Sequence, residues 1–419
     1  MIHSALLKNA ESCNKIIMIK KFGRAIQWIS WGLLTFSFCQ CGNSDETTLS
    51  KSYPAITAKF GQQIDVKNLA NYEDQAIPTY ITKDNTGLNT ITNEKATVGR
   101  VLFYDKNLSF DNSISCAGCH HQSLAFGDTA LASRGVQGGL TGRHSMRLVN
   151  SRFASETRFF WDERAISLED QTTRPIKDHA EMGFSGESGR PGFDSLLIKL
   201  SAIDYYRELF DLAYGDETIT EARLQECMGQ FIRSIQSFDT RYDAGRAQVT
   251  SDLDNFPNFT TQENQGKTLF ITPPVFNASG ERTSGGLGCA GCHRAPEFDI
   301  DPNSGNNAII GKLNADGFDV TNTRAPSLRD MTGPDGEPHT PMMHTGVITT
   351  LQAAIGHYGT ITIGANNTLL DPRLKPNGFG QKLNLTSAEV NAVIAFLKTL
   401  SGTQVYTDAR WSDPFGTQP

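Results

Sequence analysis

Cysteine is scarce in this chain and unevenly placed. Only eight of the 419 residues are cysteines, and four of them fall in two copies of the pentapeptide CAGCH, at residues 116–120 and 289–293. Three more precede residue 42, and the last is Cys227. Structural disulfides do not repeat with an identical interior and an adjacent histidine, so the pattern excludes a disulfide framework as the reason for the two pentapeptides.

The chain also lacks a hydrophobic run long enough to cross a membrane, and it lacks a surplus of positive charge. The stretch AIQWISWGLLTFSFC, at residues 25–39, has 15 residues, whereas a membrane-spanning helix needs about 20. The formal net charge is −7, and nucleic-acid binding favours a basic face. We therefore expect no nucleic-acid partner, and an acidic surface that suits a basic electron-transfer protein.

The apolar stretch instead has the flanks of an export signal. The positive segment MIKKFGR precedes it, and residues 42–60 are polar. Residues 1–41 are predicted to be a signal peptide, with Met18 as an alternative start, which places the mature protein in the periplasm. Cys41 is a candidate for lipidation and membrane anchoring. Because the three residues before it form a poor lipobox, simple cleavage remains the alternative.

Each CAGCH combines two thiols at C-x-x-C spacing with a following histidine. Such thiols can add to the vinyl groups of a haem, and the histidine can then bind its iron. A zinc ribbon would place its second pair about 15–20 residues after the first, and a thioredoxin-like pair needs no histidine. The pattern predicts two covalently bound haem c groups, one on Cys116, Cys119 and His120 and the other on Cys289, Cys292 and His293.

Similar segments flank the two motifs. TVGRVLFYD, at residues 97–105, precedes the first, and NQGKTLFIT, at residues 264–272, precedes the second with the same order of residue types. Downstream of the motifs, TGRHSMRLVN is answered by TNTRAPSLRD. This internal similarity predicts a duplicated haem-binding domain.

Helical patterns dominate, so the fold is predicted to be mainly α, with two cytochrome c-like domains, long loops and minor β-structure. Thr218 with Glu221, and Thr386 with Glu389, have capping-box spacing. Cys227 lies among apolar residues at helical intervals and is predicted to be a buried packing residue. The predicted boundaries are a signal peptide at 1–41, a tether and arm at 42–95, haem domains at 96–255 and 256–405, and a tail at 406–419.

The segment FFWDERAISLEDQTTRPIKDHAEMGF contains the candidate catalytic residues. A glutamate such as Glu181 near an open haem iron can take a proton from hydrogen peroxide and return it to the departing oxygen. Gln171 could orient peroxide by hydrogen bonding, and Trp161 could pass an electron between haems. The alternative is that Glu181 is a surface charge and Trp161 an ordinary core aromatic.

These blocks, together with RAPSLRD and PMMHTG further along, resemble the bacterial di-haem cytochrome c peroxidase and MauG family over roughly residues 95–402. The resemblance implies a peroxidatic N-terminal haem and a C-terminal haem that receives electrons. It matches Glu181 to the acid–base glutamate, Gln171 to the pocket glutamine, Pro175 to the distal proline and Trp161 to the tryptophan between the haems. His120 and His293 match the proximal iron ligands.

One departure concerns the first iron. Family members that need reductive activation carry a histidine that caps this iron, and counting sixteen residues from His120 lands on Val136. The first haem is therefore expected to be uncapped and ready for peroxide. His144 is a second, more distant candidate for the cap.

Another departure concerns the second iron, for which many relatives use a methionine. No methionine follows Met343, and the matching residue is Tyr358, the residue type that MauG uses. His357 is the alternative ligand, whereas Met342 and Met343 are disfavoured because the flanking block places them elsewhere.

The family also binds calcium between its haems, where this chain has His144 in place of an asparagine. Carbonyl groups near His339 and Pro341 could still contribute, but an imidazole is a poor ligand for this hard cation. His344 matches a family histidine near the second haem, for which a packing or hydrogen-bonding role is expected.

The sequence thus predicts an exported peroxidase that reduces hydrogen peroxide with electrons from a small redox protein such as a cytochrome c. One alternative is a MauG-like enzyme that uses peroxide to oxidise a protein or small molecule. The other is a non-enzymatic electron carrier. The family is often dimeric, so a homodimer is a further expectation from the resemblance alone.

Overall fold

The segments that lead into the two CAGCH motifs both form helices. The computed structural model describes residues 51–416. TVGRVLFYD lies in helix α2 (Asn93–Tyr104) except for its last residue, and NQGKTLFIT lies in α8 (Thr261–Ile271) except for its last residue. The N-terminus of α2 is capped by the side chain of Thr92, and that of α8 by a capping box that begins at Thr260. The helical prediction is confirmed for both segments.

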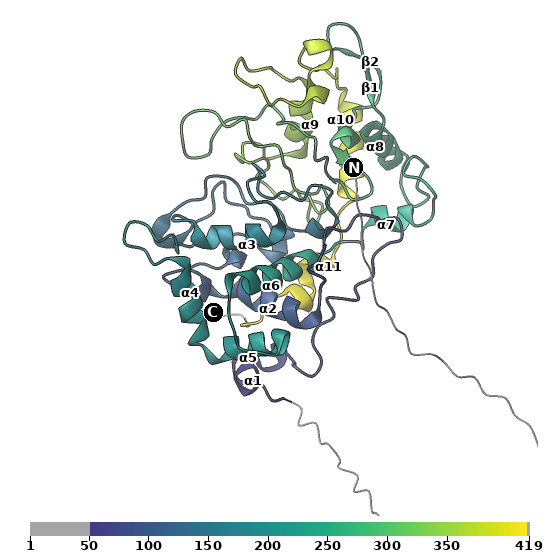
Figure 1. Cartoon of the computed structure of the whole chain (residues 1–419). Coiled ribbons are helices and arrows are strands. Elements are labelled where there is room, and N and C mark those ends of the chain that lie inside the picture. Colours follow the sequence, from purple (N-terminus) through teal and green to yellow (C-terminus); the bar gives the residue numbers. More distant parts are fainter. Residues whose placement is uncertain (1–50, 417–419) are drawn as a thin grey trace, which may run out of the picture. The chain divides into compact units, whose positions relative to one another are not determined.

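The described chain is mainly helical, with little sheet, as predicted (Figure 1). The remaining helices are α1 (Pro54–Phe60), α3 (Leu168–Lys177), α4 (Phe193–Ser201), α5 (Asp204–Tyr214), α6 (Glu221–Ser234), α7 (Arg241–Arg246), α9 (Leu351–Gly359), α10 (Ser387–Lys398) and α11 (Gln404–Thr407).

A glycine in each leading helix allows a close helix–helix contact. Helix α2 packs against α6, and α8 packs against α10. A Cβ atom added at Gly99 would overlap the carbonyl of Cys227, and one added at Gly266 would overlap that of Ala392. Glycine is thus required at both positions by the proximity of a neighbouring backbone. Cys227 itself is fully buried, which confirms its predicted packing role.

Strands are few and short in the described residues. β1 (Pro274–Phe276) pairs with β2 (Arg282–Gly285), and β3 (His293–Arg294) pairs with β4 (Asp299–Ile300), both antiparallel. The β3–β4 pair begins at the histidine of the second CAGCH motif.

Apolar side chains gather around each half of the described chain. One large cluster and a smaller neighbour draw mainly on residues 56–235, and another large cluster draws on residues 242–400. The chain then returns to the first half. Trp411 is buried in the smaller cluster, and its indole Nε1 donates to the Ser234 hydroxyl at 3.2 Å. The segment expected to be a tail therefore packs on the first half of the chain, at Trp411 against α6 and at Phe415 against Phe60 of α1.

One predicted helix start is wrong. Thr386 and Glu389 do form a capping box on α10. Thr218, however, does not cap α6, because its backbone N–H donates to the side chain of Asp216. Thr220 caps this helix instead. The side chain of Asp216 accepts the hydrogen bond from the backbone of Thr218. The cap is therefore two residues later, at Thr220, and the helix begins at Glu221.

The predicted signal peptide and Cys41 lie outside the described residues. Within residues 51–416, none of the helices is long and apolar enough to cross a membrane.

Candidate functional site

The first CAGCH motif opens onto a cavity of about 390 Å³, here called the first cavity. Cys116, Cys119 and His120 line it. So do the residues that the sequence analysis assigned to catalysis, although they lie 40 to 60 positions further along the chain: Trp161, Gln171, Pro175 and Glu181. The fold therefore brings together the motif and all four distal candidates.

His120 is oriented by the turn that follows the motif. Its Nδ1 lies 3.0 Å from the carbonyl oxygen of Phe126. A carbonyl can only accept, so Nδ1 carries the proton and Nε2 is left free for a metal. Burial lowers the pKa of His120, which favours the neutral imidazole that iron requires.

The two thiols of this motif do not have the properties of a reactive redox pair. Cys116 and Cys119 bracket a short 3-10 turn, and neither forms a disulfide. Burial raises the pKa of Cys116 to about 12 and that of Cys119 to about 11. A thioredoxin-like pair needs a lowered thiol pKa and exposure, so the geometry favours covalent attachment of a cofactor.

Gln171 and Pro175 lie one helical turn apart on α3 and face the first cavity. The chain leaves α3 at Asp178, whose carboxylate accepts hydrogen bonds from the backbone of Ala180 and Glu181. This turn directs Glu181 back to the cavity that α3 lines.

Glu181 is one of the carboxyl groups that line the first cavity. Burial, with a smaller contribution from the nearby charge of Asp178, raises its pKa to about 7. A group with such a pKa can both accept and return a proton near neutral pH. A proton-transfer role for Glu181 stays a prediction, for which its place on the cavity wall is a requirement.

Val136 occupies the position counted for a capping histidine. It is buried in a tight loop at 133–141, and its backbone N–H donates to the carbonyl of Glu181 at 2.9 Å. Gly135 packs closely against the backbone of Ala180 and Glu181. A Cβ added at Gly135 would overlap the carbonyl of Ala180. The loop thus contacts the backbone of Glu181 and fixes its position. His144, the other candidate cap, is buried and has its Nδ1 2.8 Å from the carbonyl of Ala130.

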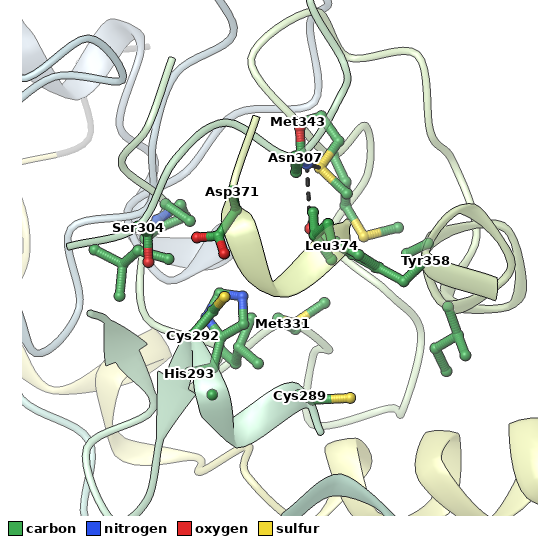
Figure 2. A pocket seen from close by; sticks show the side chains of 18 of the residues that line it. Cys289, Cys292, His293, Ser304, Asn307, Met331, Met343, Tyr358, Asp371 and Leu374 are labelled. Atoms are coloured by element: carbon green, nitrogen blue, oxygen red, sulfur yellow. Dashed lines mark hydrogen bonds between the residues drawn. The ribbon is translucent and has the colours of Figure 1, made fainter. Parts of the chain in front are cut away.

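The second CAGCH motif opens onto a cavity of about 440 Å³, here called the second cavity (Figure 2). Cys289 and Cys292 bracket the same kind of 3-10 turn as in the first motif. The Nδ1 of His293 is buried and has no hydrogen-bond partner within residues 51–416. Burial and the charge of Arg373 lower the pKa of His293 to about 4, so the ring is neutral.

Of the two candidate ligands for the second iron, only Tyr358 lines this cavity. Its hydroxyl accepts a hydrogen bond from the Asn307 amide at 3.1 Å. The neighbouring His357 has its Nε2 2.7 Å from the carbonyl of Asn307. The same Asn307 amide lies 3.3 Å from the sulfur of Met343, which also lines the cavity. Met343 is therefore closer to the candidate ligand position than the sequence indicated.

A few residues line both cavities and are here called the shared wall: His144, Ser145, Arg147, Trp161, Arg324, Ala325 and Pro326. Trp161 is held at both ends. Its indole Nε1 donates to the carbonyl of His144 at 2.7 Å, and its own carbonyl accepts from Thr323 and Arg324, each at 3.0 Å. Trp161 thus stands between the two cavities, as a residue that couples two haems must.

Comparison with known proteins supports the assignment. Residues 93–250 match the model of a family described as di-haem cytochrome c peroxidase. The methylamine utilization protein MauG of Methylophilus methylotrophus is 29% identical over 326 residues, which cover 75% of this chain and 84% of that protein. The cytochrome c551 peroxidase of Nitrosomonas europaea is 24% identical over 323 residues, 74% of this chain and 81% of its own. This chain is thus similar to di-haem cytochrome c peroxidases and to MauG proteins.

Solved structures agree on the fold. A MauG-like protein associated with microbial copper homeostasis superimposes with a TM-score of 0.61 and 25% identity, covering 82% of this chain and 99% of that one. The diheme peroxidase BthA of Burkholderia thailandensis, at 19% identity, has a TM-score of 0.52 and covers 82% and 92% of the two chains. The relatives thus include both peroxidases and MauG proteins.

Similarity to these di-haem proteins implies haem c cofactors, and the residues of this chain fit them. Each cavity has the size expected of a small-molecule or cofactor site, and each presents two unbridged cysteines and a neutral histidine. The unpartnered Nδ1 of His293 and the oriented ring of His120 are both ready to serve at a metal.

The side chains of the described residues give little support for a calcium site between the two cavities. Within residues 51–416, no group of three or more His, Cys, Asp and Glu side chains could hold a metal ion. His339 has its Nε2 3.2 Å from the hydroxyl of Tyr406, and the Nε2 of His344 lies 3.0 Å from the carbonyl of Gly311. Calcium binding through backbone carbonyls stays a prediction, and hydrogen bonding is the role that His344 has here.

Three residues of the site escaped the sequence analysis. Arg147 lies in a segment that was quoted only for its internal similarity, Asn307 lies in a stretch assigned to loop, and Met343 was placed elsewhere. The one available signal for Arg147 was the internal similarity, which pairs it with Ser327, a residue without charge, in the second half. Nothing local marks Asn307, whose neighbours in space are 36 and 51 positions away in the sequence.

Proposed function

We propose that this protein is a periplasmic peroxidase that reduces hydrogen peroxide to water at a haem held by Cys116, Cys119 and His120. Electrons enter through a second haem, held by Cys289, Cys292 and His293, with Tyr358 as its other ligand. The observation that carries the proposal is Glu181, a carboxyl group with a pKa near 7 on the wall of the first cavity. Overall, one peroxide, two electrons and two protons yield two waters.

A bound haem supplies the iron at which the O–O bond of peroxide is cleaved. Glu181 accepts the proton of the peroxide oxygen nearer the iron and donates it to the departing oxygen, which leaves as water. Gln171 orients peroxide through its side-chain amide, and Pro175 helps to exclude bulk water from the pocket. Trp161 provides the path between the cavities.

The proposed electron donor is a small cytochrome c or a similar redox protein. The net negative charge of the chain favours a donor with a basic face. Export is proposed from the N-terminal signal, and Cys41 is the proposed site of a lipid anchor if the signal is cleaved there.

A MauG-like activity is the second candidate, because the relatives include MauG proteins and because Val136 and Tyr358 both depart from the peroxidases that need activation. In that case peroxide would serve to oxidise a protein or a small molecule. A plain electron carrier needs no proton-transfer residue beside its iron, so Glu181 argues against that function.

Stopped-flow spectroscopy of the matured protein with peroxide, with and without reduced cytochrome c, tests the proposal. We expect rapid oxidation of the cytochrome, lost in Glu181→Gln and kept in the control Glu187→Gln, whose side chain is exposed. A long-lived oxidised spectrum with the cytochrome untouched would support the MauG-like function. Full turnover by Glu181→Gln would overturn the role of Glu181.

A further inference from the structure

Arg147 is a partly buried arginine on the shared wall, and its guanidinium has few partners within residues 51–416. Its Nη2 donates to the carbonyl of Ser327 at 3.0 Å. Its Nε is buried and has no hydrogen-bond partner, and no carboxylate within the described chain forms an ion pair with it. Because Arg147 lines both cavities, its free hydrogen-bonding capacity lies where two cofactors would approach each other.

Another buried arginine shows what this environment normally requires. Arg329 is fully buried and forms two 2.9 Å hydrogen bonds to the carboxylate of Asp243. A buried cation is costly to keep unless an anion compensates it. Arg147 has no such compensation from the protein, so an anion from outside the polypeptide is expected beside it.

The neighbouring groups make the shared wall cationic. Arg324 also lines both cavities, and its guanidinium donates to the backbone carbonyls of Glu156 and Arg158. Its side chain is 8% exposed. Asp330 acts on Arg147 only through its charge, and its carboxylate accepts a hydrogen bond from the backbone N–H of Gly402. An anion placed here would therefore meet two guanidinium groups.

Each haem carries two propionate carboxylates, which are planar acceptors that match the fork of an arginine. We propose that Arg147 binds a propionate of each haem at the shared wall and thereby raises the reduction potentials of both haems together. A fixed positive charge stabilises the extra electron of a reduced haem, most strongly where water is excluded. The inference rests on the two-haem part of the proposed function and not on its peroxide chemistry.

Redox titration of the matured protein, followed by optical spectroscopy of both haems, tests this inference. In Arg147→Gln, which can still donate to Ser327, we expect both midpoint potentials to fall. A tenfold change in each reduction equilibrium corresponds to about 59 mV for a one-electron couple. Arg147→Lys keeps the charge and should restore most of the shift. Arg152→Gln is the matched control. It removes the same charge, but Arg152 lines neither cavity and is paired with Asp84.

A shift in only one haem, no shift, or an equal shift in the control would overturn the inference. If Arg147→Gln does not mature with two haems, resonance Raman spectra of Arg147→Lys take its place. Altered propionate-bending frequencies in that variant are expected, and unchanged frequencies would overturn the contact. A wild-type chain without two haems would instead overturn the proposed function, so the two failures can be told apart.

Discussion

Glu181 is the residue whose protonation should set the pH dependence of the chemistry. Its pKa is raised to about 7, mainly by burial. Below that pH the carboxyl group is neutral and cannot accept a proton. The rate constant for the reaction with peroxide should therefore rise about tenfold per pH unit up to pH 7 and level off above it. Stopped-flow measurements across pH 5–9 would check this.

The same experiment on Glu181→Gln should give a rate lower by about 10²–10⁴-fold, with the rise near pH 7 removed. An amide cannot exchange the proton, although it retains the shape of the side chain. A variant that kept the pH profile would assign the titration to another group.

Substitutions of Tyr358 and of His357 should affect the second haem differently, depending on which residue is its ligand. A phenolate ligand stabilises the oxidised iron, so Tyr358→Phe should raise the potential of this haem and change its optical spectrum. His357→Gln keeps a side chain able to bond the carbonyl of Asn307 and should leave both unchanged. Redox titration of the two variants would identify the ligand. A changed potential in His357→Gln and an unchanged one in Tyr358→Phe would make His357 the ligand.

At the scale of an element, the loop at 133–141 positions Glu181 through backbone contacts. Gly135→Ala would force a Cβ against the carbonyl of Ala180 and displace the adjacent glutamate. Misplacing a catalytic group by about 1 Å can cost on the order of 10²-fold in rate. We expect a loss of this size in the peroxide reaction, with both haems still attached, as measured by stopped flow and haem absorbance.

Gly192→Ala is the control, because Gly192 lines neither cavity and a Cβ added there would meet only the Cα of Gly186, at 3.8 Å. Equal rates for the two alanine variants would mean that the loop does not position Glu181.

The helices were the more predictable elements. The small-polar, glycine and aliphatic order of TVGRVLFYD and NQGKTLFIT is typical of a helix with one close-packing glycine, so α2 and α8 follow from local sequence. The start of α6 did not, because Asp216 competes for the backbone of Thr218. Spacing alone cannot show which of two nearby side chains captures a free N–H.

At the scale of the whole molecule, the C-terminal segment holds the two halves of the chain together. Trp411 is 1% exposed and packs in a cluster formed by the first half. Trp411→Ala should lower the free energy of unfolding by about 3–5 kcal/mol, since it leaves a large cavity. Leu253→Ala, at a side chain 72% exposed, should change it by less than about 0.5 kcal/mol. Chemical denaturation followed by circular dichroism would measure both, and equal effects would contradict the prediction.

The composition of the site was predictable only where it is encoded in short motifs. The CAGCH motif predicts haem binding directly, because the two cysteines that attach the haem and the histidine that binds its iron are neighbours in the sequence. Glu181 and Gln171 could be found by their order along the chain in a known family. The contacts of Arg147 and Asn307 depend on segments that the fold brings together from far apart, and no local pattern specifies such contacts.

The clamping of Trp161 has a consequence for the rate at which charge could cross the molecule. Its indole and its carbonyl are both tied to neighbouring backbone, and its side chain is 8% exposed. A ring that cannot shift, with almost no water around it, has a small reorganisation energy. Passage of an electron through Trp161 would then need little thermal activation, so transfer between the haems should slow only weakly on cooling.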